Sequence, residues 1–309
     1  MPKMNVLQSI HIDALPEKIY PLISNLNHWN RWSPWILAEP NAKITTTNEG
    51  NYHEWEGDII GAGNLRIESS QPNVSVAMAL TFLKPWKSSA STCIHLHKTK
   101  KGARVEWTMD SRLPFFLFWM KKQMQTLIGM DYQRGLNLLK DLVENDSIPS
   151  TLQFKGLKPF HATDYIGITT RCPISEIPTH MERDYTRLMS YLMQYAQEHM
   201  CGYAFTLYHK WELTNDRVQY TACHPVSKCP AHLPEGMAFH HLPKLSAYTI
   251  RHTGPYRHIG NAWAAGMMHQ QAKRFRPNKK IPPLEVMYNS PKNTPENELV
   301  TEVLFPVRS

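Results

Sequence analysis

The sequence predicts an α+β fold in two domains for a chain of 309 residues. Three observations lead to this prediction. In the first half, a series of strand-like segments precedes one long helical stretch. A polar, proline-containing segment at residues 144–151 then separates the two halves. In the second half, the order strand, helix, strand, turn, strand occurs twice. A chain of this length also exceeds what one hydrophobic core usually holds, so two domains are expected.

The first half begins with an alternating strand at residues 6–12 and a short helix at residues 13–23, with Pro16 near its first turn. Turn residues separate the strand-like runs that follow: residues 52–55, 63–69, 74–83, 91–98 and 104–110. Residues 116–144 repeat apolar side chains at three- and four-residue steps, which is typical of an amphipathic helix. Such a helix can lie along a curved antiparallel sheet and leave a cavity between them.

Three segments of this half resemble a known family: NRWSPW at residues 30–35, VEWTM at 105–109 and DYQRGLNLLK at 131–140. They are similar to the polyketide cyclase/dehydrase-like, START-related (SRPBCC) helix-grip superfamily over residues 1–146. The resemblance implies an antiparallel sheet wrapped on a long C-terminal helix, with a hydrophobic cavity beneath the helix. It implies no particular chemistry, because this fold serves binding and catalysis alike. Trp29, Trp32 and Trp35 are interpreted as a cap packed on the core, with a ligand wall as the alternative.

Composition favours an ordinary globular protein of the cytoplasm. The hydrophobic share is 42% and the charged share 19%. The net charge of +8 permits weak attraction to nucleic acid, but the basic residues are scattered and lack helix-turn-helix or zinc-finger spacing. The five cysteines form no CxxC pair and follow no signal peptide, which suits reduced thiols. The apolar run at residues 113–120 is too short to span a bilayer. We therefore expect no membrane partner and no direct nucleic-acid partner.

No cofactor or metal is expected. Gly61-Ala62-Gly63 is only a fragment of a glycine pattern and is interpreted as a turn. His95 and His97 share a strand face, but spacing assigns them no third metal ligand. The segment at residues 223–232, with the histidines at 240 and 241, offers thiol and imidazole groups that suit zinc. Its spacing matches no common zinc pattern, so we interpret it as a polar loop.

An internal repeat organises the second half, which we place at residues 153–309 after a linker at residues 147–152. The two copies cover about residues 160–226 and 245–309. Phe205 lies opposite Glu285 at an offset of 80 positions (285 − 205), and Pro225 lies opposite Pro306 at an offset of 81 (306 − 225). Two such units would bury their apolar faces against each other and leave a groove at the junction.

Glu285 is the candidate functional residue of the repeat. It lies in a strand-like run, LEVMY, and the first copy has Phe205 at its position, while Glu302 stands opposite Thr221. The repeat accepts phenylalanine at this position. A carboxylate there either lies in a pocket or points to solvent from the polar face of an edge strand. Both interpretations stay open on the residues alone.

Two strings of the second half carry a second resemblance: HTGPY at residues 252–256 and EVMYNSPKNTPENELVTEV at residues 285–303. They resemble the gyrase-inhibitor-like (GyrI-like) effector-binding family over residues 153–308, which also forms the drug-sensing domain of several bacterial transcription regulators. By resemblance, Glu285 is the central pocket carboxylate for cationic or polarised ligands, and Glu302 is a second acid nearby. The resemblance suggests these further ligand-binding residues: Tyr203, Trp211, Tyr220, Tyr256, Trp263 and Met287. The DNA-binding module of those regulators is replaced here by the helix-grip domain.

Two functional hypotheses follow. In the first, the chain captures a small, partly apolar molecule, neutral or cationic, between aromatic walls, in a regulatory or resistance role, and Glu285 is the counter-charge for a cation. In the second, the chain is a hydrolase of strained, cyclopropane-bearing compounds, as some relatives are, with Glu285 as general base or carbocation stabiliser and Tyr203 or Tyr220 as hydrogen-bond donor. The sequence does not decide between the two, and it leaves the oligomeric state open.

Overall fold

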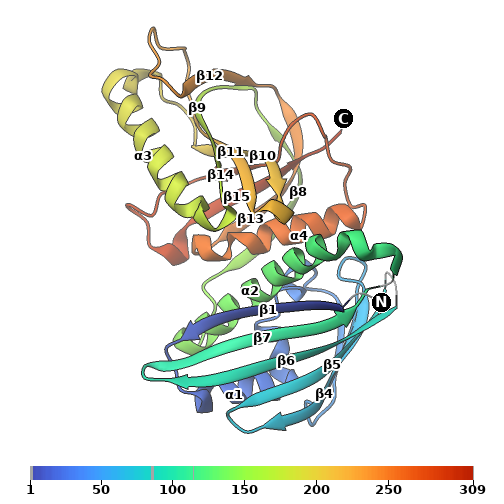
Figure 1. The fold of residues 1–309 in the computed structure, drawn as a ribbon. Helices are drawn as coiled ribbons and strands as arrows, with labels where there is room; N and C mark the ends of the chain where they lie inside the picture. Colours follow the sequence, from blue (N-terminus) through green and yellow to red (C-terminus); the bar gives the residue numbers. More distant parts are fainter. Residues whose placement is uncertain (1–2, 85–86, 114, 309) are drawn as a thin grey trace. The chain divides into compact units, whose positions relative to one another are not determined.

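The computed structural model describes residues 3–84, 87–113 and 115–308 (Figure 1). The chain forms two compact units, each with its own antiparallel sheet. The first unit covers the chain up to Pro149 together with Met267–Ala272, and the second covers the remainder from Ser150. The fold is therefore α+β.

The first unit is built on a seven-stranded sheet in the order β1-β7-β6-β5-β4-β3-β2, so chain neighbours pair throughout except where β1 joins β7. Its strands are β1 (Lys3–Ile12), β2 (Lys43–Thr46), β3 (Tyr52–Glu56), β4 (Ala62–Gln71), β5 (Ser75–Lys84), β6 (Ser88–Thr99) and β7 (Gly102–Arg112). Its helices are α1 (Pro16–Ser24), η1 (Leu26–Arg31), η2 (Ile36–Ala38), η3 (Phe115–Met120) and α2 (Lys121–Asn145). The strand β2 was not expected from the sequence, because its four residues KITT carry little apolar alternation.

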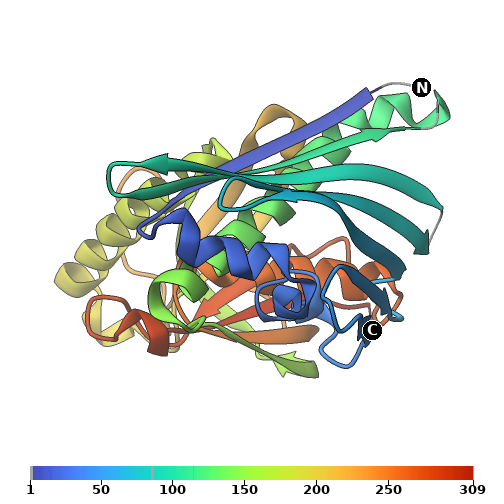
Figure 2. The same cartoon turned by 90° about the horizontal axis from the view of Figure 1, so that it is seen from below.

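Helix α2 packs along β1, and α1 contacts β5 and β6 (Figures 1 and 2). The α-helix begins at Lys121, after the 3-10 turn η3, and not at residue 116 as the periodicity predicts. Tyr132, Leu136, Leu139 and Val143 form its buried stripe. Gly135 of the same helix faces the Trp107 ring. A larger residue would not fit there, because its Cβ would come within 2.7 Å of that ring. The glycine thus allows the helix to approach the core.

The second unit contains an eight-stranded sheet in the order β12-β9-β11-β10-β14-β15-β13-β8. Its strands are β8 (Thr151–Phe160), β9 (Thr163–Cys172), β10 (Phe205–Glu212), β11 (Arg217–Pro225), β12 (Met237–Leu242), β13 (Leu245–Thr253), β14 (Leu284–Met287) and β15 (Val300–Pro306). The helices after Ser150 are η4 (Ile174–Glu176), α3 (Ile177–Tyr195), η5 (Gln197–His199), η6 (Leu213–Asn215), η7 (Tyr256–His258), α4 (Ile259–Gln271) and η8 (Glu296–Glu298). The strand order is symmetrical about the junction of β10 and β14: β10, β11 and β9 follow outward on one side, and β14, β15 and β13 follow outward on the other.

The two edge strands of this sheet were not expected from the sequence. β8 pairs with β13 from Thr151 onward and so begins inside the expected linker at residues 147–152, and β12 pairs with β9 and includes the two histidines at 240 and 241 that were assigned to a polar loop. Both strands carry the polar, charged or proline residues that edge strands tolerate, such as Pro159 and the histidines at 240 and 241. These residues interrupt the alternation of apolar and polar side chains from which strands are predicted, so neither strand was recognised.

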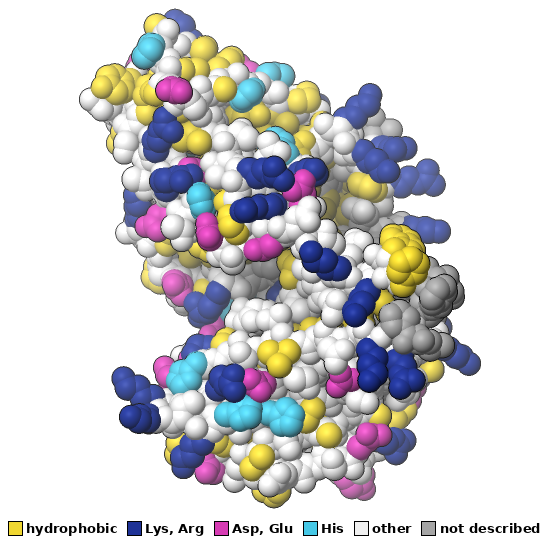
Figure 3. Space-filling model, in the orientation of Figure 1, with side chains coloured by type: hydrophobic (Ala, Val, Ile, Leu, Met, Phe, Trp, Pro, Cys, Tyr) yellow, Lys and Arg dark blue, Asp and Glu magenta, His cyan; other side chains and the backbone are white. Residues whose placement is uncertain are grey.

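On the face of the chain drawn in Figure 3, the charged side chains are dispersed. In the face shown in Figure 3, lysine and arginine side chains are spread over both units, with aspartate and glutamate between them. Among the described helices, none combines the length and apolar character that crossing a bilayer requires.

Two buried histidines are expected to make folding sensitive to acid. His53 on β3 is 1% exposed and His252 on β13 is 0% exposed. Burial lowers the pKa of each to about 4. In the unfolded chain a histidine titrates near 6.5, so between these values the unfolded state binds protons that the folded state excludes. Each neutral, buried histidine therefore makes its full contribution to the free energy of unfolding above pH 6.5, and this contribution is lost as the pH falls toward 4.

We therefore expect each of these histidines to reduce the free energy of unfolding by about 2–3 kcal/mol on acidification to pH 4. Urea unfolding at a series of pH values measures this loss. The exposed His161 is the control, since His161→Gln should leave the pH profile unchanged, whereas His53→Phe should flatten the profile of the first unit. A profile that His53→Phe does not alter would contradict the assignment.

Candidate functional site

The candidate site surrounds Glu285 on the central strand β14. Glu285 pairs with Thr206 of β10 on one side and with Val303 of β15 on the other. Cross-strand partners share a face of the sheet, so these three side chains point the same way. Only 8% of Glu285 is exposed. The acid therefore lies inside the unit and not on a wet edge strand.

Two neutral donors hold the Glu285 carboxylate. The Trp263 indole Nε1 donates to Oε1, and the Tyr208 hydroxyl donates to Oε2 at 3.0 Å. Burial raises the pKa of Glu285, while these two hydrogen bonds oppose the rise. Within the described residues, no lysine, arginine or histidine forms an ion pair with Glu285. The site therefore contains a buried acid without a cationic partner among the residues that the structure describes.

Aromatic rings enclose this carboxylate. Tyr208 and Trp211 are stacked with centroids 5.3 Å apart, and Trp263 meets Tyr208 edge-on at 5.0 Å. Trp211 and Tyr208 share a face because a β-bulge between Tyr208 and Lys210 shifts the register of β10. The bulge thus places a second indole on the sheet face that carries the carboxylate.

Two further tyrosines border the acid from the helices. Tyr185 of α3 donates to the Phe205 carbonyl and contacts the Thr206 hydroxyl, both at 2.8 Å. Tyr256 begins η7 and is 38% exposed. Burial raises the pKa of both tyrosines, and the nearby Glu285 charge raises each further. Their hydroxyls stay protonated and can act only as neutral hydrogen-bonding groups at ordinary pH.

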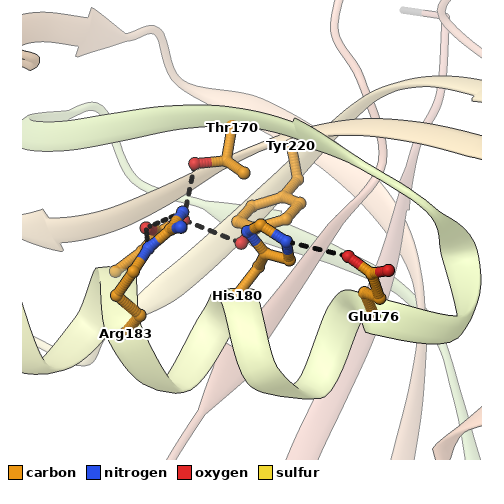
Figure 4. Close-up of polar contacts among 6 residues, drawn as sticks. Thr170, Glu176, His180, Arg183 and Tyr220 are labelled. Carbon is orange, nitrogen blue, oxygen red and sulfur yellow. Dashed lines mark hydrogen bonds and ion pairs between the residues drawn. The ribbon is translucent and has the colours of Figure 1, made fainter.

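A second buried acid, Asp184 of α3, anchors this helix to β9 and β11, and Figure 4 labels the three residues that contact it, Thr170, Arg183 and Tyr220. It accepts hydrogen bonds from the hydroxyls of Thr170 at 2.6 Å and Tyr220 at 2.8 Å. Arg183 pairs with it at 2.9 Å from the solvent side. Sequence reasoning missed Asp184, although an acid within the stripe Met181-Asp184-Tyr185-Leu188 breaks the apolar face of the helix, which is a usable signal.

The structure brings together most of the residues that the sequence selected. Glu285, Trp211 and Trp263 are in one cluster, and Met287 lies on the same strand face as Glu285 because side chains alternate. Tyr220 pairs with Tyr208 across β10 and β11, but its hydroxyl is engaged by Asp184. Tyr208 itself was missed, although it sits at the strand position that faces the acid.

Glu302 and Tyr203 do not join this cluster, which corrects the expectation of a second acid near Glu285. Glu302 pairs with Val286, the neighbour of Glu285, so it points to the opposite face of the sheet. There it binds Arg251 at 2.8 Å and accepts a hydrogen bond from Tyr288 at 2.8 Å. Tyr203 is 54% exposed and its ring lies 4.7 Å from that of Tyr288. Glu302 is thus already neutralised by a cation.

The histidine-rich segment engages other partners. His224 contacts the Pro225 carbonyl at 2.9 Å, and His241 contacts Asp164 at 2.6 Å. Across residues 3–84, 87–113 and 115–308, no three histidine, cysteine or acidic side chains gather as metal ligands do.

Comparison with known families agrees with this architecture. Residues 157–308 match the family of GyrI-like small molecule binding domains, and residues 3–144 match the polyketide cyclase/dehydrase and lipid transport family. The chain therefore joins an N-terminal domain of the cyclase/dehydrase family to a C-terminal GyrI-like small molecule binding domain. Both resemblances seen in the sequence are confirmed.

Several solved structures are similar to parts of this chain. The EcmrR–DNA complex in EcmrR-RPo, solved by cryo-EM, is 18% identical over 62% of this chain and 69% of that chain, with a TM-score of 0.45. The EcmrR C-terminal domain is 22% identical over 52% and 99%, with a TM-score of 0.41. Protein MLL2253 from Mesorhizobium loti is 12% identical over 47% and 99%, with a TM-score of 0.37. Comparison with curated proteins gives no match.

Proposed function

We propose that the second unit captures a small, partly apolar cation, with Glu285 as its counter-charge and Tyr208, Trp211 and Trp263 as its walls. One observation carries the proposal. Glu285 is 8% exposed and no cation of the described chain neutralises it. A buried carboxylate normally has a charged partner, because desolvation of an unpaired charge is unfavourable. A cationic ligand would provide that partner.

The hydrogen bonds of the site indicate how a ligand would enter. The indole of Trp263 blocks one carboxylate oxygen, so a ligand that binds there must displace it. Trp263 is half-buried on α4, and its movement would leave aromatic faces that attract cations. The indole Nε1 of Trp211 is buried without a partner among the described residues. A ligand with one hydrogen-bond acceptor would satisfy it.

A pair of matched probes tests this proposal. Benzyltrimethylammonium is cationic, and neopentylbenzene has the same shape without the charge. We expect the full chain to bind the cation more tightly in calorimetric titrations. Glu285→Gln should weaken cation binding by roughly 10- to 100-fold and leave the neutral compound nearly unaffected, because only the charge-dependent part is lost.

Glu302→Gln is the control for this experiment, since Glu302 lies on the opposite face and is paired with Arg251. We expect it to bind the cation as the unchanged protein does. Equal weakening by both substitutions, or no preference for the cation in the unchanged protein, would contradict the proposal.

A hydrolase remains the second candidate, favoured by the contact between an acid and a hydroxyl. Burial raises the pKa of Glu285, which makes its carboxylate a stronger base, and Tyr208 can donate to a developing charge. In this case turnover of a cyclopropane-bearing electrophile should fall at least 100-fold in Glu285→Gln. Binding of the same compound should persist. Turnover that survives the substitution would remove Glu285 from the chemistry.

The wider setting is also a proposal. We infer a helix-grip arrangement for the first unit, supported by the packing of α2 along the sheet at β1. We infer a duplicated origin for the second unit, supported by the mirrored strand order about β10 and β14. A cytoplasmic regulatory or resistance role fits the five free cysteines. The linker and domain limits near residue 150 are consistent with the division of the chain at Pro149.

A further inference from the structure

One end of the sheet in the second unit carries a row of basic side chains that four segments contribute. These segments are β8, the link between β12 and β13, the chain beyond the end of β15, and the segment that follows α4. They lie far apart in the sequence, where their charges appear scattered, and the fold brings them together. The basic row, as we call it, consists of six exposed residues: Lys158, Lys244, Arg276, Lys279, Lys280 and Arg308.

Backbone pairing places the four segments side by side. Lys158 of β8 lies opposite Ala247 of β13, which in turn lies opposite Pro306 of β15. Just beyond, Pro277 forms an antiparallel bridge with Val307, so the segment after α4 runs along the other side of the chain end. Neighbouring strands lie about 4.8 Å apart, and the four segments therefore span roughly 15 Å.

Two guanidinium groups of the row leave the backbone at opposed positions. The Arg308 N–H donates to the Arg276 carbonyl at 3.0 Å, next to the bridge. Like charges that face each other across a strand pair repel and destabilise the pairing. The following turn, in which the Lys280 N–H donates to Asn278 Oδ1 at 3.0 Å, adds Lys280 and Lys279 beside them. An anion bound between these side chains would relieve the repulsion.

The chain itself supplies no such anion in these segments. Within the residues that the structure describes, no member of the basic row forms an ion pair, whereas the Arg251 guanidinium of the same unit is neutralised by a glutamate. The row is therefore a positively charged surface that attracts polyanions. Aspartate and glutamate are absent from all four stretches that form this end of the sheet: residues 151–160, 243–249, 273–283 and 304–308.

We propose that the basic row binds the phosphate backbone of a nucleic-acid duplex without reading its sequence. Duplex DNA carries one negative charge per about 1.7 Å of its axis, so a row of roughly 15 Å meets several phosphates. Exposed lysine and arginine side chains are the groups that make such contacts. An extended row suits a polyanion better than a small free anion, because its side chains do not converge on one point.

The uncharged residues of the four stretches favour a duplex over other partners. Single strands bind through base stacking on exposed rings, and membrane surfaces through exposed aromatic anchors. Both are disfavoured here because every aromatic ring of these stretches is buried or half-buried. A protein partner is disfavoured because lysine is depleted from protein interfaces. The rings concerned are Phe154, Phe160, Tyr248, Phe275 and Phe305.

The test follows the fluorescence anisotropy of a labelled DNA duplex of about 20 base pairs while the full chain is added at several KCl concentrations. We expect a dissociation constant of roughly 1–100 μM at physiological salt and a slope of log K against log[KCl] of about −4 to −5, as for about five phosphate contacts. The combined variant Arg276→Gln, Lys279→Gln and Lys280→Gln should weaken binding at least ~10-fold and reduce the slope by roughly 3.

The control variant removes the same charge elsewhere. Lys98→Gln, Lys100→Gln and Lys101→Gln lie at the turn between β6 and β7 of the first unit, and together they should change the affinity by about 2-fold or less. A second variant of the row, Lys158→Gln with Lys244→Gln, should reduce the slope by roughly 2 and decides the question if the triple variant does not fold. Equal losses in the control, or an unchanged slope in both row variants, would overturn the proposal.

Further probes at the same salt concentration identify the kind of partner. Single-stranded DNA, polyglutamate, and vesicles of phosphatidylcholine and phosphatidylserine should each bind more weakly than the duplex. If any of them binds as tightly as the duplex, and loses this binding in the triple variant, the assignment to a duplex is wrong. Duplex RNA of the same sequence distinguishes the two sources of the backbone, since the tighter duplex is the partner that the row fits better.

Discussion

Replacement of Trp107 by alanine is expected to destabilise the first unit by about 3–5 kcal/mol, the usual range for loss of a buried tryptophan. Trp107 is 1% exposed and contacts several rings of the core, including Tyr132 at 4.0 Å. Its indole also donates to Thr92, which would lose one partner in the variant. Urea unfolding followed by circular dichroism should show an earlier transition for the first unit and an unchanged one for the second.

Trp119 provides the matched control, because it is 68% exposed. Trp119→Ala should change the free energy of unfolding by about 0.5 kcal/mol or less, as surface substitutions usually do. Similar losses in the two variants would show that Trp107 is not central to the core.

Replacement of Asp184 by alanine is expected to destabilise the second unit by about 3–5 kcal/mol, the range seen when one partner of a buried polar network is removed. Asp184 is 2% exposed, and the variant leaves the hydroxyls of Thr170 and Tyr220 without their acceptor. Helix α3 would also lose its anchor to β9 and β11. Because Tyr185 of α3 contacts Thr206 beside Glu285, binding of benzyltrimethylammonium should weaken together with stability.

Substitution of Arg183 distinguishes the contribution of the exposed ion pair from that of the buried hydrogen bonds of Asp184. Its side chain is 59% exposed, so Arg183→Ala should alter the free energy of unfolding by about 1 kcal/mol or less. Urea unfolding of both variants makes the comparison. Equally large losses in Arg183→Ala and Asp184→Ala would mean that the ion pair, and not the buried hydroxyl contacts, holds the helix.

The sequence predicted the elements whose apolar residues follow one period. The long helix of the first unit and the central strands of both sheets belong to this group, and Glu285 stood out because it interrupts such a strand. The edge strands β8 and β12 were missed because tertiary pairing with β13 and β9 holds segments whose composition resembles a loop. In these cases the neighbouring strand, and not the local sequence, determines the structure.

The site was predicted less completely because it depends on register. Glu285 and Glu302 appear equivalent in the sequence, yet the pairing of Glu302 with Val286 turns them to opposite faces. Similarly, the bulge after Tyr208 brings Trp211 onto the sheet face that carries Glu285. The sequence contains no glycine or proline at the bulge that would have predicted it. A shift of one residue in strand pairing moves each side chain to the other face of the sheet. The pairing register cannot be read from a single sequence.

The hydrogen bond between Trp263 and Glu285 gives the most direct test of the cation site. The indole N–H signal of Trp263, assigned with Trp263→Phe, can be followed by NMR while benzyltrimethylammonium is added to the full chain. If the cation takes the carboxylate, this signal should move upfield at saturation as the N–H loses its charged acceptor, and it should not respond in Glu285→Gln. A cation that binds while the Trp263 signal stays unchanged would contradict the account and place the ligand elsewhere.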